Sequence, residues 1–129
     1  MTDASGPGQL DYAQAVHLLA QLVPAGAVLS YGDVAELLGS GGPRQVGKAM
    51  ATAEDGTPWW RVLRADGNIA EPLLLRAREH WEKEKLARPG KRVDIKNLRW
   101  NPTPKQWEAI DILRLSLGNP KMSELDDEL

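Results

Sequence analysis

The side chains that most often carry out chemistry are scarce in this chain. Its 129 residues include no cysteine and only two histidines, His17 and His80. The missing cysteines exclude a thiol nucleophile, a disulfide and a cysteine-based zinc site. Neither histidine has a nucleophile beside it, as a catalytic triad requires, and we expect both to be surface or packing residues. Glu82 and Glu84 are expected to be solvated helix charges, so the sequence predicts no catalytic residue and no metal site.

The glycine-rich segment does not predict a phosphate-binding loop. Residues 39–43 read Gly-Ser-Gly-Gly-Pro and lack the lysine–serine pair that a P-loop uses. We interpret this segment as a tight turn between two helices, and the sequence predicts no cofactor.

Charge is distributed unevenly along the chain. Residues 1–60 carry two basic and six acidic side chains, residues 61–105 twelve basic and six acidic, and residues 106–129 two basic and six acidic. The middle segment therefore has a net charge of +6, although the whole chain has −2. A basic middle between acidic ends is typical of a protein with a polyanionic partner. Solvated charges on a helix surface would give the same count, and both interpretations stay open on this feature alone.

Two short helices joined by the glycine turn form a helix-turn-helix pattern. Ser30 is placed to cap the first helix, Gly39 to end it, and Pro43 suits the first position of the second. The outer face of the second helix combines basic and small residues, which are Arg44, Gly47, Lys48 and Ala51. Such helix pairs occur in DNA-binding proteins and also in enzymes that never touch DNA.

The rest of the chain is predicted to be mostly helical. Apolar residues at helical spacing predict helices over about residues 11–23, 73–88 and 105–117, the second of them ended by Pro89-Gly90. Residues 93–100 are expected to be extended. The acidic sequence at the end of the chain, SELDDEL, is expected to be disordered.

One small sheet is predicted in the middle of the chain. Asp66-Gly67 lies between two short stretches, residues 61–64 and 68–70, and this arrangement predicts a β-hairpin. The fold class expected is α/β and mostly helical, a winged-helix-like domain with a helix-turn-helix and a small β-hairpin.

Three sequence blocks together resemble the DNA-binding domain of the O6-alkylguanine-DNA alkyltransferases. The blocks are VLSYGDVA at residues 28–35, RQVGKAM at 44–50 and PWWRV at 58–62. In those repair enzymes a helix-turn-helix precedes a Pro-Cys-His-Arg-Val sequence, whose cysteine accepts the alkyl group. The order and approximate spacing of the blocks match over residues 10–101. The chain is most similar to the alkyltransferase-like proteins, in which tryptophan usually replaces that cysteine.

The resemblance implies a lesion pocket without an alkyl acceptor. Trp59 occupies the position of the cysteine, and an aromatic wall suits a flat purine that stacks on it. The backbone groups of Val62 and Leu63 would face the flipped base. The pocket residues implied by the resemblance are Pro58, Trp59, Trp60, Arg61, Val62 and Leu63.

The resemblance also implies how the DNA is held. Arg44 matches the arginine that enters the helix and fills the gap left by a flipped base, and Tyr31 matches the tyrosine that crowds the phosphate beside it. Gly47 and Ala51 would let the helix lie close to the minor groove, while Lys48 supplies charge. Three more arginines, Arg64, Arg76 and Arg78, could contact phosphates, with solvated surface charges as the default interpretation.

Two departures from the family pattern concern the pocket. The family histidine that follows the cysteine position is Trp60 here, which would enlarge the aromatic wall or narrow the pocket. Some family members also place an arginine near the alkyl group, shortly after the expected hairpin. Glu71-Pro72 offers none at that point, unless Arg76 reaches back.

The function implied by the resemblance is non-enzymatic recognition of O6-alkylguanine in double-stranded DNA by nucleotide flipping, which marks the lesion for nucleotide excision repair proteins. The boundaries expected are a flexible tail at 1–9, the DNA-binding domain at 10–101, and a C-terminal helical extension with an acidic tail at 102–129. We expect a monomer without a membrane partner. The missing signal-peptide pattern and cysteines favour a cytoplasmic location, nucleoid-associated in a bacterium.

Three other functions stay open from the sequence. The first is a helix-turn-helix regulator that binds undamaged DNA without lesion preference. The second is an alkyltransferase with another acceptor, and the third is a protein-interaction domain that has lost DNA binding.

Overall fold

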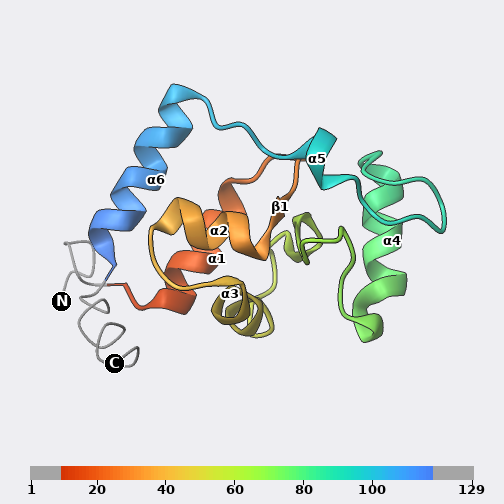
Figure 1. Cartoon of the computed structure of the whole chain (residues 1–129), viewed down its shortest axis with the longest axis horizontal. Helices are drawn as coiled ribbons and strands as arrows, with labels where there is room; N and C mark the ends of the chain where they lie inside the picture. The colour runs from red at the N-terminus through yellow and green to blue at the C-terminus, as the bar shows by residue number, and fades with distance from the viewer. Residues whose placement is uncertain (1–9, 118–129) are drawn as a thin grey trace.

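The computed structural model describes residues 10–117, which form a mostly helical fold with a small two-strand sheet (Figure 1). Helices α1, α2 and α3 lie in the middle, α6 lies on one side of them and α4 on the other. None of the helices in this part of the chain is long and apolar enough to span a bilayer. The tail expected at 1–9 and the disorder expected at the acidic end fall outside the described residues. The elements in order are α1 Tyr12–Leu22, β1 Leu29–Ser30, α2 Tyr31–Leu38, α3 Pro43–Met50, the 3-10 turn η1 Trp59–Arg61, β2 Val62–Leu63, the 3-10 turn η2 Glu71–Leu73, α4 Leu74–Lys83, α5 Ile95–Leu98 and α6 Pro104–Ser116.

The predicted helix-turn-helix is confirmed, together with the residues that bound it. The Ser30 hydroxyl accepts the N–H of Asp33 at 3.0 Å, and the Asp33 carboxylate accepts the N–H of Ser30 at 2.9 Å. This reciprocal pair satisfies two backbone donors at the start of α2. Gly39 ends α2 in the left-handed conformation, at φ +72°, and Pro43 begins α3. The turn between the helices is held from α1, because the Tyr12 hydroxyl donates to the Ser40 carbonyl at 2.8 Å.

The two short strands separate two hydrophobic cores. Leu29 and Val62 face a first core built from α1, α2, α3 and α6. Val28 and Leu63 face a second core that surrounds α4. Successive strand residues point to opposite faces of a sheet, so four buried side chains in two neighbouring segments join both cores.

The predicted β-hairpin was wrong. β2 pairs in parallel with β1, in the register Leu29 with Val62 and Ser30 with Leu63. The tight turn is present, with the Gly67 N–H donating to the Arg64 carbonyl at 2.9 Å and the Arg64 N–H donating to the Asn68 carbonyl at 3.0 Å, but residues 68–70 form no strand. Two adjacent apolar residues in a strand favour burial on both faces, which is typical of parallel pairing with helices on either side.

The predicted long helix over residues 73–88 was too long. α4 ends at Lys83, and a 3-10 turn precedes it. The Leu86 N–H donates to the Trp81 carbonyl at 2.7 Å and the Lys85 N–H to the Glu82 carbonyl at 3.2 Å. These two bonds are those of a Schellman motif, which closes a helix before any proline is needed.

The segment over residues 93–100 is only partly extended, because it contains the short helix α5. The Val28 N–H donates to the Leu98 carbonyl at 3.0 Å, and the Trp100 N–H donates to the Val28 carbonyl at 2.8 Å. The helix predicted at 105–117 is confirmed as α6, which buries Ile110 and Leu113 in the first core.

We expect that Gly67, in the turn after β2, cannot be replaced without a large loss of stability. It has φ +84°, and a Cβ there would collide with the backbone carbonyl oxygen of Val93. We predict that Gly67→Ala lowers the free energy of unfolding by about 3 kcal/mol, through the left-handed backbone and the clash together. Gly56→Ala is the control, because Gly56 has φ +94° but no atom within 4 Å of a Cβ. Its cost in urea unfolding should be about 1 kcal/mol; equal costs would contradict the clash.

Candidate nucleic-acid interface

The parallel register brings Tyr31 and Arg64 together, because each follows the last residue of a paired strand. Both side chains line a surface hollow of about 440 Å³, which they share with Arg44, Gly47 and Lys48 of α3. The structure therefore gathers four of the five residues expected to hold DNA. It adds Arg64, which the sequence offered only as one of several surface arginines.

Gly47 allows the Tyr31 ring to lie on α3. A Cβ at Gly47 would lie 3.2 Å from Cε2 of that ring, tighter than ordinary contact. Burial raises the pKa of the Tyr31 phenol, although the nearby Arg64 charge opposes the rise. The hydroxyl therefore stays protonated at neutral pH and can donate a hydrogen bond to an anionic oxygen.

The cations around this hollow are free to meet an outside charge. Arg44, Lys48 and Arg64 are exposed, and none of them forms an ion pair with a carboxylate of residues 10–117. Arg44 lies directly after the first residue of α3, at the positive end of the helix dipole, where a cation is disfavoured. An anionic partner would offset that cost. Ala51 is exposed at the C-cap of α3 and does not line the hollow.

The two tryptophans of the third sequence block lie where the two cores meet. Trp59 is half-buried and packs against both cores. It meets Trp60 edge-on, with ring centroids 5.7 Å apart and an interplanar angle of 88°. His80 of α4 stacks on Trp60 at 3.6 Å and 8°, and its edge-on distance to Trp59 is 5.8 Å. The three rings form one aromatic corner between η1 and α4.

Arg76 does reach back toward the predicted pocket. Its guanidinium carbon lies 5.3 Å from the centroid of the Trp59 ring, within cation–π distance. The first turn of α4 thus places an arginine beside a ring that the resemblance assigns to the pocket. Helical geometry places this side chain, so the spacing of the motif alone could not locate it.

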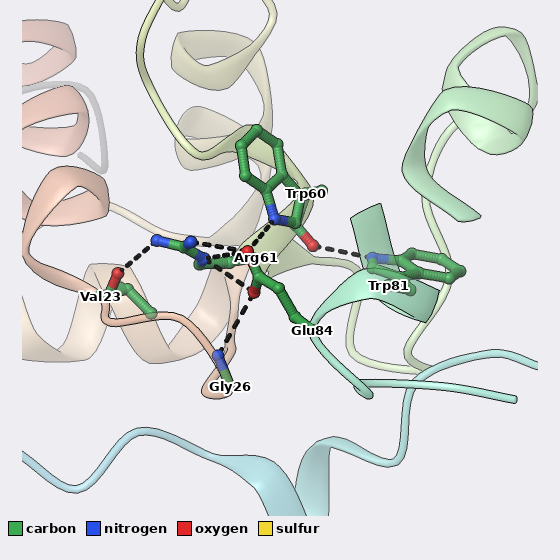
Figure 2. A network of polar contacts seen from close by, with 6 residues as sticks. All are labelled: Val23, Gly26, Trp60, Arg61, Trp81 and Glu84. Carbon is green, nitrogen blue, oxygen red and sulfur yellow. Dashed lines mark hydrogen bonds and ion pairs between the residues drawn. The ribbon is translucent and has the colours of Figure 1, made fainter. Parts of the chain in front are cut away.

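Glu84 is the centre of a polar network and is not the solvated charge we expected (Figure 2). Its carboxylate accepts hydrogen bonds from Nε1 of Trp60 at 2.9 Å, from Nη2 of Arg61 at 2.6 Å and from the Gly26 N–H at 3.3 Å. Arg61 also donates through Nη1 to the Val23 carbonyl at 2.9 Å. These partners are distant in sequence, and a helix pattern that ends in Glu-Lys-Glu gives no sign of them.

The pKa of the Glu84 carboxyl is lowered by its hydrogen bonds. Burial alone would raise the pKa of Glu84, but the hydrogen bonds from Arg61, Trp60 and Gly26 hold it below its ordinary value of 4.5. The pKa of His80 is also lowered, first by burial and then by the charge of Lys83. The imidazole on Trp60 is therefore neutral at pH 7.

The remaining residues of the predicted pocket are buried. Val62 and Leu63 are 1% and 0% exposed, and Pro58 is also buried, so none of these three residues is presented at the surface. No strand of the described chain covers the edge of β2 opposite β1. His17 has a packing role, with Nε2 2.7 Å from the Ala49 carbonyl. Within residues 10–117 no three acidic or histidine side chains are grouped as metal ligands would be.

The architecture is that of a helix-turn-helix domain with a small sheet and an aromatic corner beside it. The family model for the DNA-binding domain of 6-O-methylguanine DNA methyltransferase matches residues 11–89. The chain belongs to this family.

Curated relatives carry the name DNA base-flipping protein. The protein from Escherichia coli (strain K12) is 35% identical over 96 residues, which cover 70% of this chain and 74% of the relative. The protein from Vibrio parahaemolyticus serotype O3:K6 (strain AQ3810) is 32% identical over 90 residues, which cover 62% of this chain and 86% of the relative.

Two solved structures share the fold. S. pombe Atl1 in complex with damaged DNA containing O6-carboxymethylguanine matches with a TM-score of 0.61 and 24% identity, over 70% of this chain and 94% of that one. The Mycobacterium tuberculosis O6-methylguanine methyltransferase matches with a TM-score of 0.54 and 30% identity, over 64% of this chain and 53% of that one.

Removing the Glu84 carboxylate should destabilise the fold. We predict that Glu84→Ala lowers the free energy of unfolding at pH 7 by about 3 kcal/mol, because Arg61 and the Trp60 N–H lose their shared acceptor. Glu82→Ala, two residues earlier and exposed, should change the free energy of unfolding by less than about 0.5 kcal/mol in the same urea titration.

The difference in the free energy of unfolding between wild type and Glu84→Ala should become smaller at acidic pH. A carboxylate whose pKa is lowered by folding stabilises the folded state above its unfolded pKa, and this contribution is lost as pH falls through the folded value. The gap should therefore be constant from pH 7 to about 5 and narrow below that. A gap that widens on acidification would contradict the network.

Proposed function

We propose that this protein recognises O6-alkylguanine in duplex DNA by flipping the modified nucleotide, without removing the alkyl group. The observation that carries the proposal is that the chain contains no cysteine, while the sequence resemblance assigns Trp59 to the position of the family's cysteine. The name of the relatives, DNA base-flipping protein, supports the flipping step. The DNA in the complex of the structural neighbour Atl1 supports the choice of lesion.

The hollow on α3 would bind the duplex. Arg44 and Lys48 project from the outer face of α3, and Arg64 approaches from β2. Arg44 is long enough to fill the space of a displaced base and can hydrogen-bond its orphaned partner. Tyr31 would press on the phosphate beside the target nucleotide and donate a hydrogen bond to it.

The aromatic corner would receive the flipped base. A guanine modified at O6 pairs poorly, so extruding it costs less than the few kcal/mol required for an intact pair. Stacking on a tryptophan offers about 1–3 kcal/mol per base in return. Arg76 already lies over Trp59, so the guanidinium would contact or be displaced by the incoming purine and its alkyl group.

Without a thiol the protein would bind the lesion and leave it chemically intact. We infer that it acts as a monomer in the cytoplasm and marks the site for nucleotide excision repair proteins. A regulator that binds undamaged DNA is the alternative, and it predicts equal affinity for modified and unmodified duplexes.

The decisive measurement is equilibrium binding to two duplexes that differ only in one guanine or O6-methylguanine. Wild type should prefer the modified duplex by about tenfold or more, since each 1.4 kcal/mol of cheaper flipping is a factor of ten. Arg44→Ala should weaken binding to the modified duplex by about tenfold. Trp59→Ala should bring the two affinities close together, because it removes the stacking surface.

Lys105→Ala is the matched control for Arg44→Ala. Lys105 follows a helix-initiating proline in α6, as Arg44 does in α3, and it is exposed. Its affinity should stay within about twofold of wild type. Equal binding of wild type to both duplexes would overturn lesion recognition. A gain in protein mass after incubation with the modified duplex would overturn the non-enzymatic role.

A further inference from the structure

A second basic hollow lies beyond the C-terminal end of α4. Its volume is about 610 Å³, and four of its lining residues are cations, Lys85, Arg88, Lys91 and Arg92. All four are exposed, and among the described residues none of them forms an ion pair with a carboxylate. The aromatic corner and the α3 hollow do not account for this concentration of charge.

Lys85 occupies a backbone conformation that glycine usually takes. It has φ +60°, and it is the only residue other than glycine with a positive φ between residues 10 and 117. It holds the left-handed position of the Schellman motif that ends α4, where a side chain costs free energy. The cost of a side chain at this position makes the Lys85 charge a candidate for a function.

The loop that carries the four cations is anchored at both ends. Glu84, one residue before Lys85, is fixed by the network with Arg61 and Trp60. At the other end the Val93 N–H donates to the Gly67 carbonyl at 3.0 Å, and the Val93 side chain is buried. The backbone of the loop is therefore held at both ends, and α4 connects it to the aromatic corner.

We propose that this second hollow binds phosphates of the same DNA duplex, several base pairs from the flipped nucleotide; the proposal rests on the proposed function. Arg76 lies over the Trp59 ring, and a rise of about 1.5 Å for each of the nine steps from Arg76 to Lys85 gives roughly 13 Å. In the proposed complex α4 runs along the duplex, where that distance corresponds to about four base pairs at 3.4 Å each.

Two carboxylates also line the hollow, but they do not cancel its charge. Asp94 accepts a hydrogen bond from the Asn97 amide at 2.6 Å, and Glu82 lies on the last turn of α4. Four cations against two anions still favour a partner with repeated negative charge. Leu86, the large apolar side chain of the loop, is 3% exposed, so it is turned into the core and the long side chains exposed around the hollow are charged.

The double variant Arg88→Gln/Lys91→Gln tests the hollow without touching the Glu84 anchor. Its matched control is Lys96→Gln/Lys105→Gln, which removes the same charge from exposed positions outside the hollow. Binding is measured on a duplex with a central O6-methylguanine and on two duplexes in which one arm or the other is cut to three base pairs.

Wild type should lose about tenfold in affinity when the arm that contacts the hollow is shortened, and little when the other arm is shortened. Arg88→Gln/Lys91→Gln should bind the central-lesion duplex about tenfold more weakly and should no longer respond to that cut. Its plot of log K against log salt should be shallower by about 1.8, for two lost phosphate contacts. A variant that matches the control, or that keeps the arm dependence of wild type, would overturn the proposal.

Lys85→Gly separates this role from a structural one. Glycine suits the left-handed position, so the melting temperature should rise, while affinity for the long duplex falls several-fold. A higher melting temperature with unchanged affinity would show that Lys85 contacts no DNA. The arm experiment can be repeated with unmodified guanine, so a failure of lesion preference and a failure of the hollow give different results.

Discussion

The site depends on a parallel pairing of only two residues in each strand. Leu29 lies opposite Val62 and Ser30 opposite Leu63, and both pairs are buried. This register sets the start of α2 beside the end of β2, which brings Tyr31 next to Arg64. It also places η1, which directly precedes β2, where the two cores meet. A slip of one residue would exchange the side chains between the cores and separate the two halves of the interface.

The aromatic corner is fixed by polar contacts and not by packing alone. Trp60 is held by His80 on its face and by Glu84 at its indole N–H, while Arg61 links the same carboxylate to the end of α1. The Arg61–Glu84 pair is partly buried, with side chains 16% and 13% exposed. Such a pair contributes little net stability compared with an apolar replacement, but it disfavours alternative arrangements because an unpaired charge away from water is costly. In this chain the pair links η1 to the residue that follows α4, and these two elements carry Trp59 and Arg76.

Local signals in the sequence were enough to predict the helices near the N-terminus and the helix-turn-helix. Ser30, Gly39 and Pro43 act on the backbone within a few residues of themselves, so these helix ends can be predicted from a short stretch of sequence. The hairpin prediction was wrong because Asp66-Gly67 specifies a turn but does not determine which strand pairs with β2. That pairing is determined by the burial of both Val62 and Leu63, which depends on helices far along the chain.

The contrast between local signals and contacts made by residues far apart in sequence also explains what was missed in the site. Glu84 and Arg76 were misjudged or left open because their partners lie more than fifteen residues away and meet them only after α4 has packed. Lys85 was missed for another reason. Pro89-Gly90 is a strong helix breaker, but α4 already ends at Lys83 through backbone hydrogen bonds that any side chain permits. Lys85 occupies the left-handed position of this helix end, where glycine is the usual residue.

The loss of the thiol changes what the rest of the surface must supply under the proposed function. An enzyme that forms a covalent bond to the alkyl group can tolerate a short-lived complex, because one reaction makes the outcome irreversible. A sensor has to hold the flipped nucleotide by noncovalent contacts until another protein arrives. Stacking contributes about 1–3 kcal/mol per base and flipping consumes part of it, so much of the affinity must come from phosphates. Under the proposed function this requirement would account for the cations concentrated between residues 61 and 105, in a chain whose overall charge is −2.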